Sequence, residues 1–548
     1  MPPKGSSVTL STSNGIATAQ NISEKMATTT PLGLGRAPLD DLNGSSPGVW
    51  RADAAPATDG RLARGSSVED LAHPFARLQS ASGGPMKVAI LSDFVRVPYA
   101  NGAIFQTRAL YRLLRQCGHQ VTIIGPRDPD ALPSELAPGT VEFPSFPLRA
   151  YPGVHVPLPF SRDIFDPNRW DFDIVFAQTT SLLAEFGVWL RKVKRIPLIC
   201  VNTTYLAAAY DVVLPPWLAK GPLHAILDRG LKRPLERISA TTYNRSDGLV
   251  VLSEGFADYW RARGVKVPIH VIPRTVSLDV FGNGQTEDPY PALLAAAGLD
   301  PASPRLLCSG RHTREKSHDR LIRIFARQIL PVLPRAALFL VGVGPETASH
   351  KALAAELGVA DRVIFTGEVS FAEMPPYYRH ADVFVHTSLS ETFGNVLGEA
   401  LWSAAPVVAM ADGMGASSQI RDGVNGHLID PYKPSELAAD RAFGQAVVGL
   451  IGNPLARRRL GRNAARMARE RSSPDVIERR LVEAFESAMK HGRETLPASP
   501  LTGFWLALAS AVHFCKWAIV MGLVCLFGAI RPARQRLRRV VHHPSIAE

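Results

Sequence analysis

Short apolar runs alternate with amphipathic helical stretches twice along the chain, and this pattern constrains the fold most. The first series starts with a strand at Lys87–Leu91 and a helix at Ile104–Arg115, and it ends with a strand at Ile269–Ile272. The second series runs from a strand at Arg305–Cys308 to a strand at Pro406–Ala409. Alternation of this kind forms right-handed βαβ units and a parallel sheet with helices on both faces. The sequence therefore predicts an α/β protein with two tandem Rossmann-like, doubly wound domains facing a cleft.

The two series divide the 548 residues into predicted segments. Residues 1–85 are rich in Ser, Thr, Gly, Pro and Ala without a sustained apolar period, which is typical of disorder. We expect this disordered region (1–85), a first Rossmann-like domain (86–275), a linker rich in Pro, Gly, Asp and Ala (276–304), a second Rossmann-like domain (305–473), a helix that returns to the first domain (474–490) and an apolar, membrane-associated segment with an Arg-rich tail (491–548).

Cysteine spacing and net charge narrow the class of protein. The five cysteines form no C-x-x-C motif, which argues against a disulfide framework or a zinc ribbon and fits a reducing compartment. A net charge of +12 favours nucleic acid or anionic lipid as partner. Basic stripes interleaved with aromatic residues, as nucleic-acid binding requires, do not occur. The charge therefore indicates an anionic membrane surface and no nucleic acid.

An acidic pair brackets the start of a helix predicted over 393–404. Glu391 and Glu399 are eight residues apart, so in a helix they would lie roughly 80° apart around the axis and about 12 Å apart along it. Between them Gly394 and Asn395 fall at the helix N-terminus, where free N–H groups favour an anion. In this order the first carboxylate suits the hydroxyls of a sugar, the helix end suits a diphosphate, and the second carboxylate suits the hydroxyls of a ribose. The alternative is two solvated helix glutamates.

A basic loop, Ser309–Lys316, follows the strand at Arg305–Cys308 and precedes a helix predicted over 316–330. Arg311 supplies a bidentate fork and Lys316 a point charge, so both could reach a diphosphate and neutralise it as it leaves, without a metal. The alternative is a basic surface loop. Glycine turns at Asn101-Gly102 and Gly342–Pro345 would let backbone approach a ligand, although such turns also carry glycine for conformational reasons alone.

In this order the segments resemble the retaining glycosyltransferases of family 4. That GT-B group includes phosphatidylinositol mannosyltransferases and diacylglycerol glycosyltransferases. The resemblance covers roughly residues 86–490 of the chain. It is carried by Asn101-Gly102, Gly118-His-Gln-Val121, Gly310-Arg311 with Lys316, Gly342-Val-Gly-Pro345, Arg362-Val-Ile-Phe-Thr-Gly367, Glu391 with Glu399, Pro406-Val-Val-Ala409 and Asp422-Gly-Val-Asn-Gly426.

The resemblance implies a retaining, metal-independent hexosyltransferase whose first domain binds the acceptor and whose second binds the donor. The nucleotide diphosphate sugar would be a substrate, with UDP favoured over GDP, and no cofactor is expected. Arg311, Lys316 and Glu391 would be catalytic, while Glu399 would hold the ribose. The implied donor-binding residues are Gly102, Arg311, Lys316, Val363, Ile364, Phe365, Glu391, Phe393, Gly394, Asn395, Val396 and Glu399.

Departures from the family pattern lie on the acceptor side and at the hinge. Many members carry a histidine where this chain has Asn202 and another where it has Gln178. The junction Ile-Pro-Asn-Gly-Val-Asp reads Ile272-Pro-Arg-Thr-Val-Ser277 here. Asp93 is the nearest titratable group in the first half. Asp93, Gln178 and Asn202 are therefore the acceptor-side candidates.

The stretch Gly503–Ile530 is apolar apart from His513 and Lys516, and Arg531 begins a basic tail. As a helix its 28 residues would measure about 42 Å, against a hydrocarbon core of roughly 30 Å. A single span would leave one basic flank outside, which favours a re-entrant hairpin or an in-plane segment. A true span and a soluble packing helix are the alternatives. The mixed basic and apolar stretch 214–234 is a second membrane candidate.

These features together predict transfer of a hexose to a membrane lipid acceptor at the cytoplasmic face of the membrane, with the enzyme bound peripherally or through a re-entrant segment. Three alternatives remain open: transfer to a soluble or polyprenyl-linked oligosaccharide, sugar-nucleotide binding without catalysis, and a GT-B epimerase.

Overall fold

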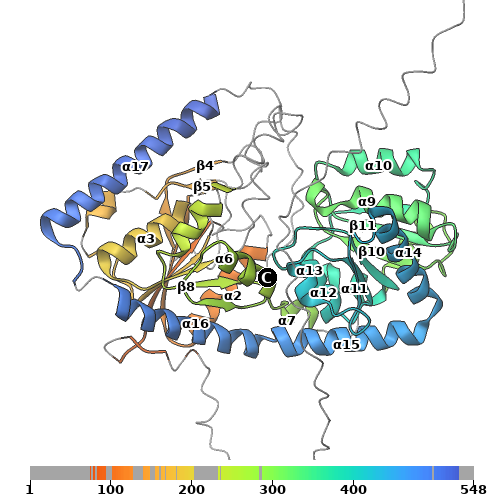
Figure 1. Cartoon of the computed structure of the whole chain (residues 1–548), viewed down its shortest axis with the longest axis horizontal. Helices are drawn as coiled ribbons and strands as arrows, with labels where there is room; N and C mark the ends of the chain where they lie inside the picture. Colours follow the sequence, from red (N-terminus) through yellow and green to blue (C-terminus); the bar gives the residue numbers. More distant parts are fainter. Residues whose placement is uncertain are drawn as a thin grey trace, which may run out of the picture. The chain divides into compact units, whose positions relative to one another are not determined.

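The structure is a computed structural model (Figure 1). It describes residues 75, 78–80, 83–93, 102–127, 140–147, 155–159, 162–166, 168–179, 182–202, 233–234, 236–282, 287–496 and 499–529. The expected disorder of residues 1–85 falls mostly outside these ranges, as do the Arg-rich tail and nearly all of 214–234.

The first sheet consists of seven parallel strands in the order β3-β2-β1-β6-β7-β8-β9. Apolar runs form these strands because helices cover both faces of the sheet. The strands are β1 (Lys87–Ser92), β2 (Gln120–Pro126), β3 (Thr140–Phe143), β6 (Ile174–Gln178), β7 (Leu198–Val201), β8 (Gly248–Val251) and β9 (Ile269–Val271). The helices of this domain are α2 (Gly102–Gln116), α3 (Leu182–Lys194) and α6 (Glu254–Ala262).

Helix α16 (Pro474–Thr495) returns to the first domain and packs on β7 and β8. Phe485, which is fully buried, stacks on Phe176 of β6 with ring centroids 5.6 Å apart. Phe75, which is also fully buried, contacts the Phe485 ring edge-on, with ring centroids 5.9 Å apart. The core of the first domain thus includes a residue before Met86, so the expected boundary at residue 85 is wrong there.

The second sheet consists of six parallel strands in the order β12-β11-β10-β13-β14-β15. The strands are β10 (Arg305–Ser309), β11 (Ala337–Val341), β12 (Val363–Gly367), β13 (Val383–His386), β14 (Val407–Met410) and β15 (His427–Ile429). The helices are α9 (His318–Ile324), α10 (Thr347–Glu356), α11 (Met374–His380), α12 (Asn395–Trp402), α13 (Gly415–Gln419), α14 (Glu436–Gly452) and α15 (Pro454–Ser472). Two doubly wound parallel sheets confirm the predicted fold class.

The segment expected as a linker is instead part of the second domain. It forms α7 (Leu278–Phe281) and α8 (Tyr290–Ala296). Tyr290 and Leu294 are fully buried in the second core, and the Tyr290 hydroxyl donates to the Tyr377 carbonyl oxygen at 2.7 Å. Apolar side chains at helical spacing therefore outweigh the Pro- and Gly-rich composition of this stretch.

The C-terminal apolar segment forms one unbroken helix, α17 (Gly503–Ala529), which contacts α3. Leu506, Ser510 and His513 are buried, and His513 Nε2 lies 2.9 Å from the Pro159 carbonyl oxygen. Lys516 Nζ donates to Glu185 Oε2 at 3.0 Å. The helix contains no turn, so it does not form the hairpin, while the in-plane form of the prediction stays a prediction.

Within the described part of the chain, every helix is too short or too polar to traverse a bilayer.

A buried ion pair ties α3 to the first sheet and yields a prediction on stability. Arg191 Nε and Nη2 donate to the Asp247 carboxylate at 2.8 and 2.7 Å, and the Leu198 N–H donates to it at 2.9 Å. Asp247 is fully buried, so Asp247→Ala leaves an uncompensated guanidinium and should cost about 3–5 kcal/mol in urea unfolding. Asp258→Ala, which breaks the exposed pair with Arg261, is the control and should change nothing measurable. Equal effects of the two changes would contradict the structural role of Asp247.

Candidate active site

Strand order in the second sheet reverses between β10 and β13, which are hydrogen-bonded neighbours although β11 and β12 lie between them in sequence. Ligands of doubly wound sheets bind at such a switch point, beyond the carboxyl ends of the strands. The loop after β10 carries Lys316, and the loop after β13 carries Glu391. The topology therefore brings together two charged residues that are distant in sequence.

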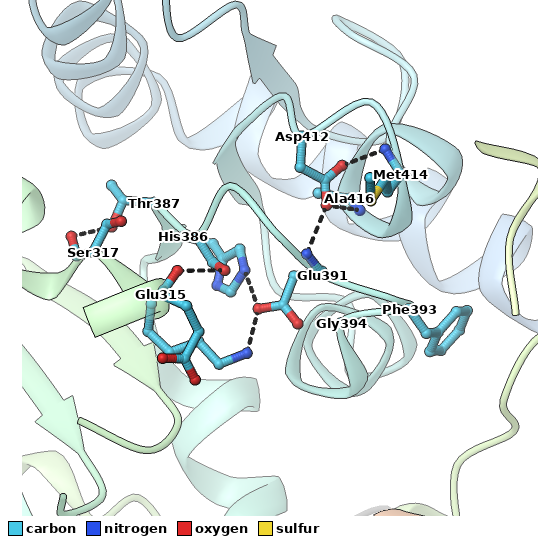
Figure 2. Close-up of polar contacts among 12 residues, drawn as sticks. Glu315, Ser317, His386, Thr387, Glu391, Phe393, Gly394, Asp412, Met414 and Ala416 are labelled. Carbon is cyan, nitrogen blue, oxygen red and sulfur yellow. Dashed lines mark hydrogen bonds and ion pairs between the residues drawn. The ribbon is translucent and has the colours of Figure 1, made fainter. Parts of the chain in front are cut away.

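Lys316 and Glu391 form an ion pair at this point. Lys316 Nζ donates to Glu391 Oε1 at 2.6 Å, and His386 Nε2 lies 3.2 Å from the same oxygen (Figure 2). Glu391 is buried, and burial alone would raise the pKa of its carboxyl. The charges of Lys316 and His386 outweigh burial and hold that pKa well below its usual range. Glu391 is therefore a carboxylate at neutral pH.

The loop that carries Lys316 is tied to the segment after β13. Thr387 Oγ1 donates to the Ser317 carbonyl oxygen at 2.9 Å, and Ser388 Oγ donates to that of Glu315 at 3.2 Å (Figure 2). The helix predicted to start at Lys316 starts at His318 instead, after a 3₁₀ turn. Ser317 has a left-handed backbone, φ 53°, and this separates the turn from the helix.

The glycine turn Gly342–Pro345 supports the same loop. A Cβ on Gly342 would lie 2.1 Å from the Gly310 carbonyl oxygen, and one on Gly344 would lie 2.3 Å from that of His312. The two backbones pack too closely for any other residue type. Close packing of the two backbones therefore explains both glycines without a ligand.

Glu391 lies before the helix, in agreement with the helix predicted over 393–404. Helix α12 starts at Asn395, and Gly394 caps it with a left-handed backbone, φ 79°. Phe393 is buried, which turns the chain inward before the helix begins. The helical spacing of 80° and about 12 Å between the two glutamates therefore does not apply. The Glu391 side chain packs against Gly394, since a Cβ there would lie 3.4 Å from Glu391 Cγ.

Asp412 fixes the backbone around Glu391, and the sequence analysis missed it. Its carboxylate accepts the N–H groups of Glu391 at 3.2 Å, Met414 at 2.9 Å and Ala416 at 3.2 Å (Figure 2). The signal that could have revealed it is an aspartate two residues beyond β14, where parallel strands present functional loops.

Glu399 lies on α12 in a different environment from Glu391. The Tyr378 hydroxyl donates to Glu399 Oε2 at 2.7 Å and lies 2.9 Å from Ser309 Oγ. Burial raises the pKa of Glu399 to about 7, while the hydrogen bond from Tyr378 opposes that rise. One carboxylate is thus held ionised and the other titrates near neutrality. Tyr378 and His386 are further residues that the sequence analysis missed.

The remaining predicted donor residues occupy four places. Arg311 is exposed on the loop after β10. Val363, Ile364 and Phe365 form the edge strand β12, with the Val363 side chain in the core, so only its backbone is available to a base. Val396 is in the first turn of α12 with Asn395, and Gly102 is the first residue of α2 in the other domain. Among the predicted donor residues, Lys316 contacts Glu391, and Glu391 contacts Gly394.

The three acceptor-side candidates lie at the carboxyl ends of neighbouring strands. Asp93 follows β1, Gln178 ends β6 and Asn202 follows β7. Each is hydrogen-bonded: Thr179 Oγ1 donates to Asp93 at 2.5 Å, Thr107 Oγ1 donates to Gln178 at 3.1 Å, and Asn202 Nδ2 donates to the Tyr243 hydroxyl at 2.9 Å. The topology thus places these polar residues along one edge of the first sheet.

Two family models match the chain. Residues 100–280 match the model described as Glycosyltransferase Family 4, and residues 291–466 match Glycosyl transferases group 1.

Two curated relatives span most of the same region. The alpha-monoglucosyldiacylglycerol synthase of Streptococcus pneumoniae is 27% identical over 59% of this chain and 71% of its own length. The D-inositol 3-phosphate glycosyltransferase of Nocardia farcinica is 28% identical over 66% of this chain and 73% of its own.

Solved structures share the architecture. The Anabaena protein HepE, in complex with UDP and glucose, matches with a TM-score of 0.55 at 18% identity, over 73% of this chain and all of its own. Such a distant likeness bears on the fold alone. With the two family models, the relatives and this fold, the chain belongs to the glycosyltransferases of family 4 and has their GT-B architecture.

Proposed function

We propose that this glycosyltransferase is a retaining, metal-independent hexosyltransferase that uses a nucleotide diphosphate sugar, UDP before GDP, and a membrane lipid acceptor. The observation that carries the proposal is the Lys316–Glu391 pair at the switch point of the second sheet, in contact with the cap of α12. A cation, a helix N-terminus and a buried carboxylate are the groups that a charged leaving diphosphate and sugar hydroxyls require.

In the proposed reaction the protein lowers the barrier mainly by stabilising charge on the departing diphosphate. Arg311, Lys316 and the N–H groups at the start of α12 would meet the phosphate oxygens. Glu391, held as a carboxylate, would accept hydrogen bonds from the transferred sugar, and Glu399 from the ribose. The acceptor would attack the sugar on the same face from which the diphosphate leaves, and this retains the anomeric configuration.

A lipid acceptor fits the printed name of one relative, a diacylglycerol glucoside synthase. It also fits the two-sided character of α17. Phe504, Trp505, Leu508 and Val512 are exposed at 43–72%, whereas the face with Leu506 and His513 packs on the first domain. A helix with one apolar face free and Arg-rich sequence after it is suited to lie in the plane of an anionic, cytoplasmic leaflet.

The proposed reaction is tested by turnover with UDP-, GDP- and ADP-hexoses, first ranked by thermal shift, and with diacylglycerol, polyprenyl-phosphate or soluble oligosaccharide acceptors. We expect a glycolipid product with the donor's anomeric configuration in the presence of EDTA. An inverted product, a need for metal, or a changed donor sugar without transfer would contradict the proposal.

The cations should matter for turnover in distinguishable ways. Arg311→Ala should lower kcat roughly 10²–10³-fold with little change in Tm, because Arg311 is exposed. Lys316→Ala should lower both, since it removes the main partner of buried Glu391. The double variant with Lys316→Ala and Glu391→Gln should regain the Tm that Lys316→Ala lost, but not its activity. Arg314→Ala, in the same turn, is the control. Activity that recovers together with Tm would contradict the role of Lys316.

Glu399 should make nucleotide binding depend on pH. Its pKa lies at about 7, so UDP affinity should rise severalfold from pH 6 to pH 8 as the carboxylate forms. The pKa is raised from 4.5, so the stability from this group is full below pH 4.5 and is lost as pH rises through 7. Calorimetry and urea unfolding of Glu399→Gln should show neither trend from this group, which corrects for the titration of UDP itself. Identical profiles for the two proteins would contradict the assignment.

The exposed face of α17 should bind anionic vesicles. Replacing Phe504, Trp505, Leu508 and Val512 by Ser should lower flotation with acidic liposomes about tenfold or more, because each apolar side chain loses its lipid contact. Replacing the exposed Val332, Leu437 and Leu455 of the second domain by Ser is the matched control. Unchanged flotation of the α17 variant would move the membrane contact elsewhere, with 214–234 as the next segment to test.

A further inference from the structure

Arg274 is a half-buried cation that lacks an acidic partner among the described residues. Its Nε is fully enclosed and has no hydrogen-bond partner. Its Nη1 donates to Asn395 Oδ1 at 3.4 Å, a long contact with a neutral amide. Among the described residues no carboxylate pairs with it, and burial lowers its pKa to about 10. The guanidinium is still charged at neutral pH, and enclosing its Nε without a partner costs free energy.

Other arginines of the second domain also have one enclosed nitrogen without a partner, but another nitrogen of each makes a short contact. Arg320 donates to Asp440 at 2.7 Å and lies 3.8 Å from Glu436. Arg379 and Arg471 each donate to a main-chain carbonyl oxygen at 2.9 Å, so they hold neighbouring segments in place. Within the part of the chain that the structure describes, Arg274 has neither kind of partner and only the 3.4 Å contact with the Asn395 amide.

The surroundings of Arg274 are electropositive and belong to the candidate active site. Asn395 is the first residue of α12, whose N-terminal N–H groups have no side-chain cap. The preceding Gly394 packs against the Glu391 side chain, which is bound to Lys316. A continuous row of contacts therefore leads from Arg274 across the start of α12 to Lys316.

Charge balance indicates what this row of residues binds. Glu391 offsets part of the Lys316 charge within their ion pair, so Lys316 offers less than a full positive charge to the donor. A sugar-nucleotide diphosphate carries negative charge on both phosphates, and the charge grows when the sugar leaves. A further cation would balance that charge, and Arg274 lies next to the start of α12 with no carboxylate partner among the described residues.

We propose that Arg274 binds a phosphate oxygen of the donor diphosphate, as a third cation beside Arg311 and Lys316. The inference rests on the proposed use of a nucleotide sugar. It accounts for a half-buried guanidinium with an unpartnered Nε at the hinge position where the family pattern has asparagine. An arginine fork can also hold two phosphate oxygens at once, which an amide cannot.

The first measurement separates a ligand-binding role from a structural one. Arg274→Met keeps most of the side-chain volume and removes the charge, so the ligand-free full chain should melt at or above the wild-type Tm. Arg320→Met is the matched control and should melt lower, because it leaves Asp440 and Glu436 without their partner. A fall in Tm for Arg274→Met as large as for Arg320→Met would overturn the proposal in favour of a structural role.

The second measurement is titration calorimetry with the nucleoside diphosphate, UDP, GDP or ADP, that stabilises the wild type most. Arg274→Met should bind it about tenfold or more weakly, and Arg274→Lys should recover part of the loss. Binding of the nucleoside diphosphate by Arg274→Met within twofold of wild type would overturn the inference. The inference would also be overturned if Arg274→Met changed only the preference between UDP-glucuronate and UDP-glucose. If the wild type itself binds none of the three, the proposed function fails instead.

Discussion

One ion pair, Lys316 with Glu391, organises the second domain's functional end. Its two residues are 75 positions apart in sequence and meet because β10 and β13 are neighbours in the sheet. Around the pair, Thr387 and Ser388 hold the lysine loop, and Asp412 holds the glutamate backbone. A buried carboxylate is tolerated only with a charged partner, so the position of each loop depends on the other.

The two glutamates of α12 and its preceding loop show how environment divides similar groups. Glu391 meets Lys316 and His386 and remains ionised, whereas Glu399 meets only the Tyr378 hydroxyl and has a pKa of about 7. In the proposed reaction the first would bind the sugar in its charged form at all physiological pH values. The second would make ribose binding sensitive to pH.

The fold and part of the site followed from sequence because they depend on local pattern. Runs such as Lys87–Leu91 are apolar on both faces and can only be inner strands of a covered sheet. The relative placement of Glu391 and Glu399 could not be predicted, since it depends on the turn at buried Phe393 that precedes the helix. His386, Asp412 and Tyr378 were missed because their roles depend on folded contacts with Glu391 and Glu399 and not on a local motif. The two faces of α17 depend on packing against the first domain, which composition does not reveal.

The central claim is that Lys316, Glu391, Glu399 and the start of α12 bind one extended donor. The most direct measurement is a crystal structure of the full chain with its nucleotide diphosphate sugar. We expect the diphosphate oxygens within hydrogen-bond distance of Lys316 and the first N–H groups of α12, the sugar hydroxyls on Glu391 and the ribose on Glu399. A nucleotide bound away from the carboxyl ends of β10 and β13 would contradict the account.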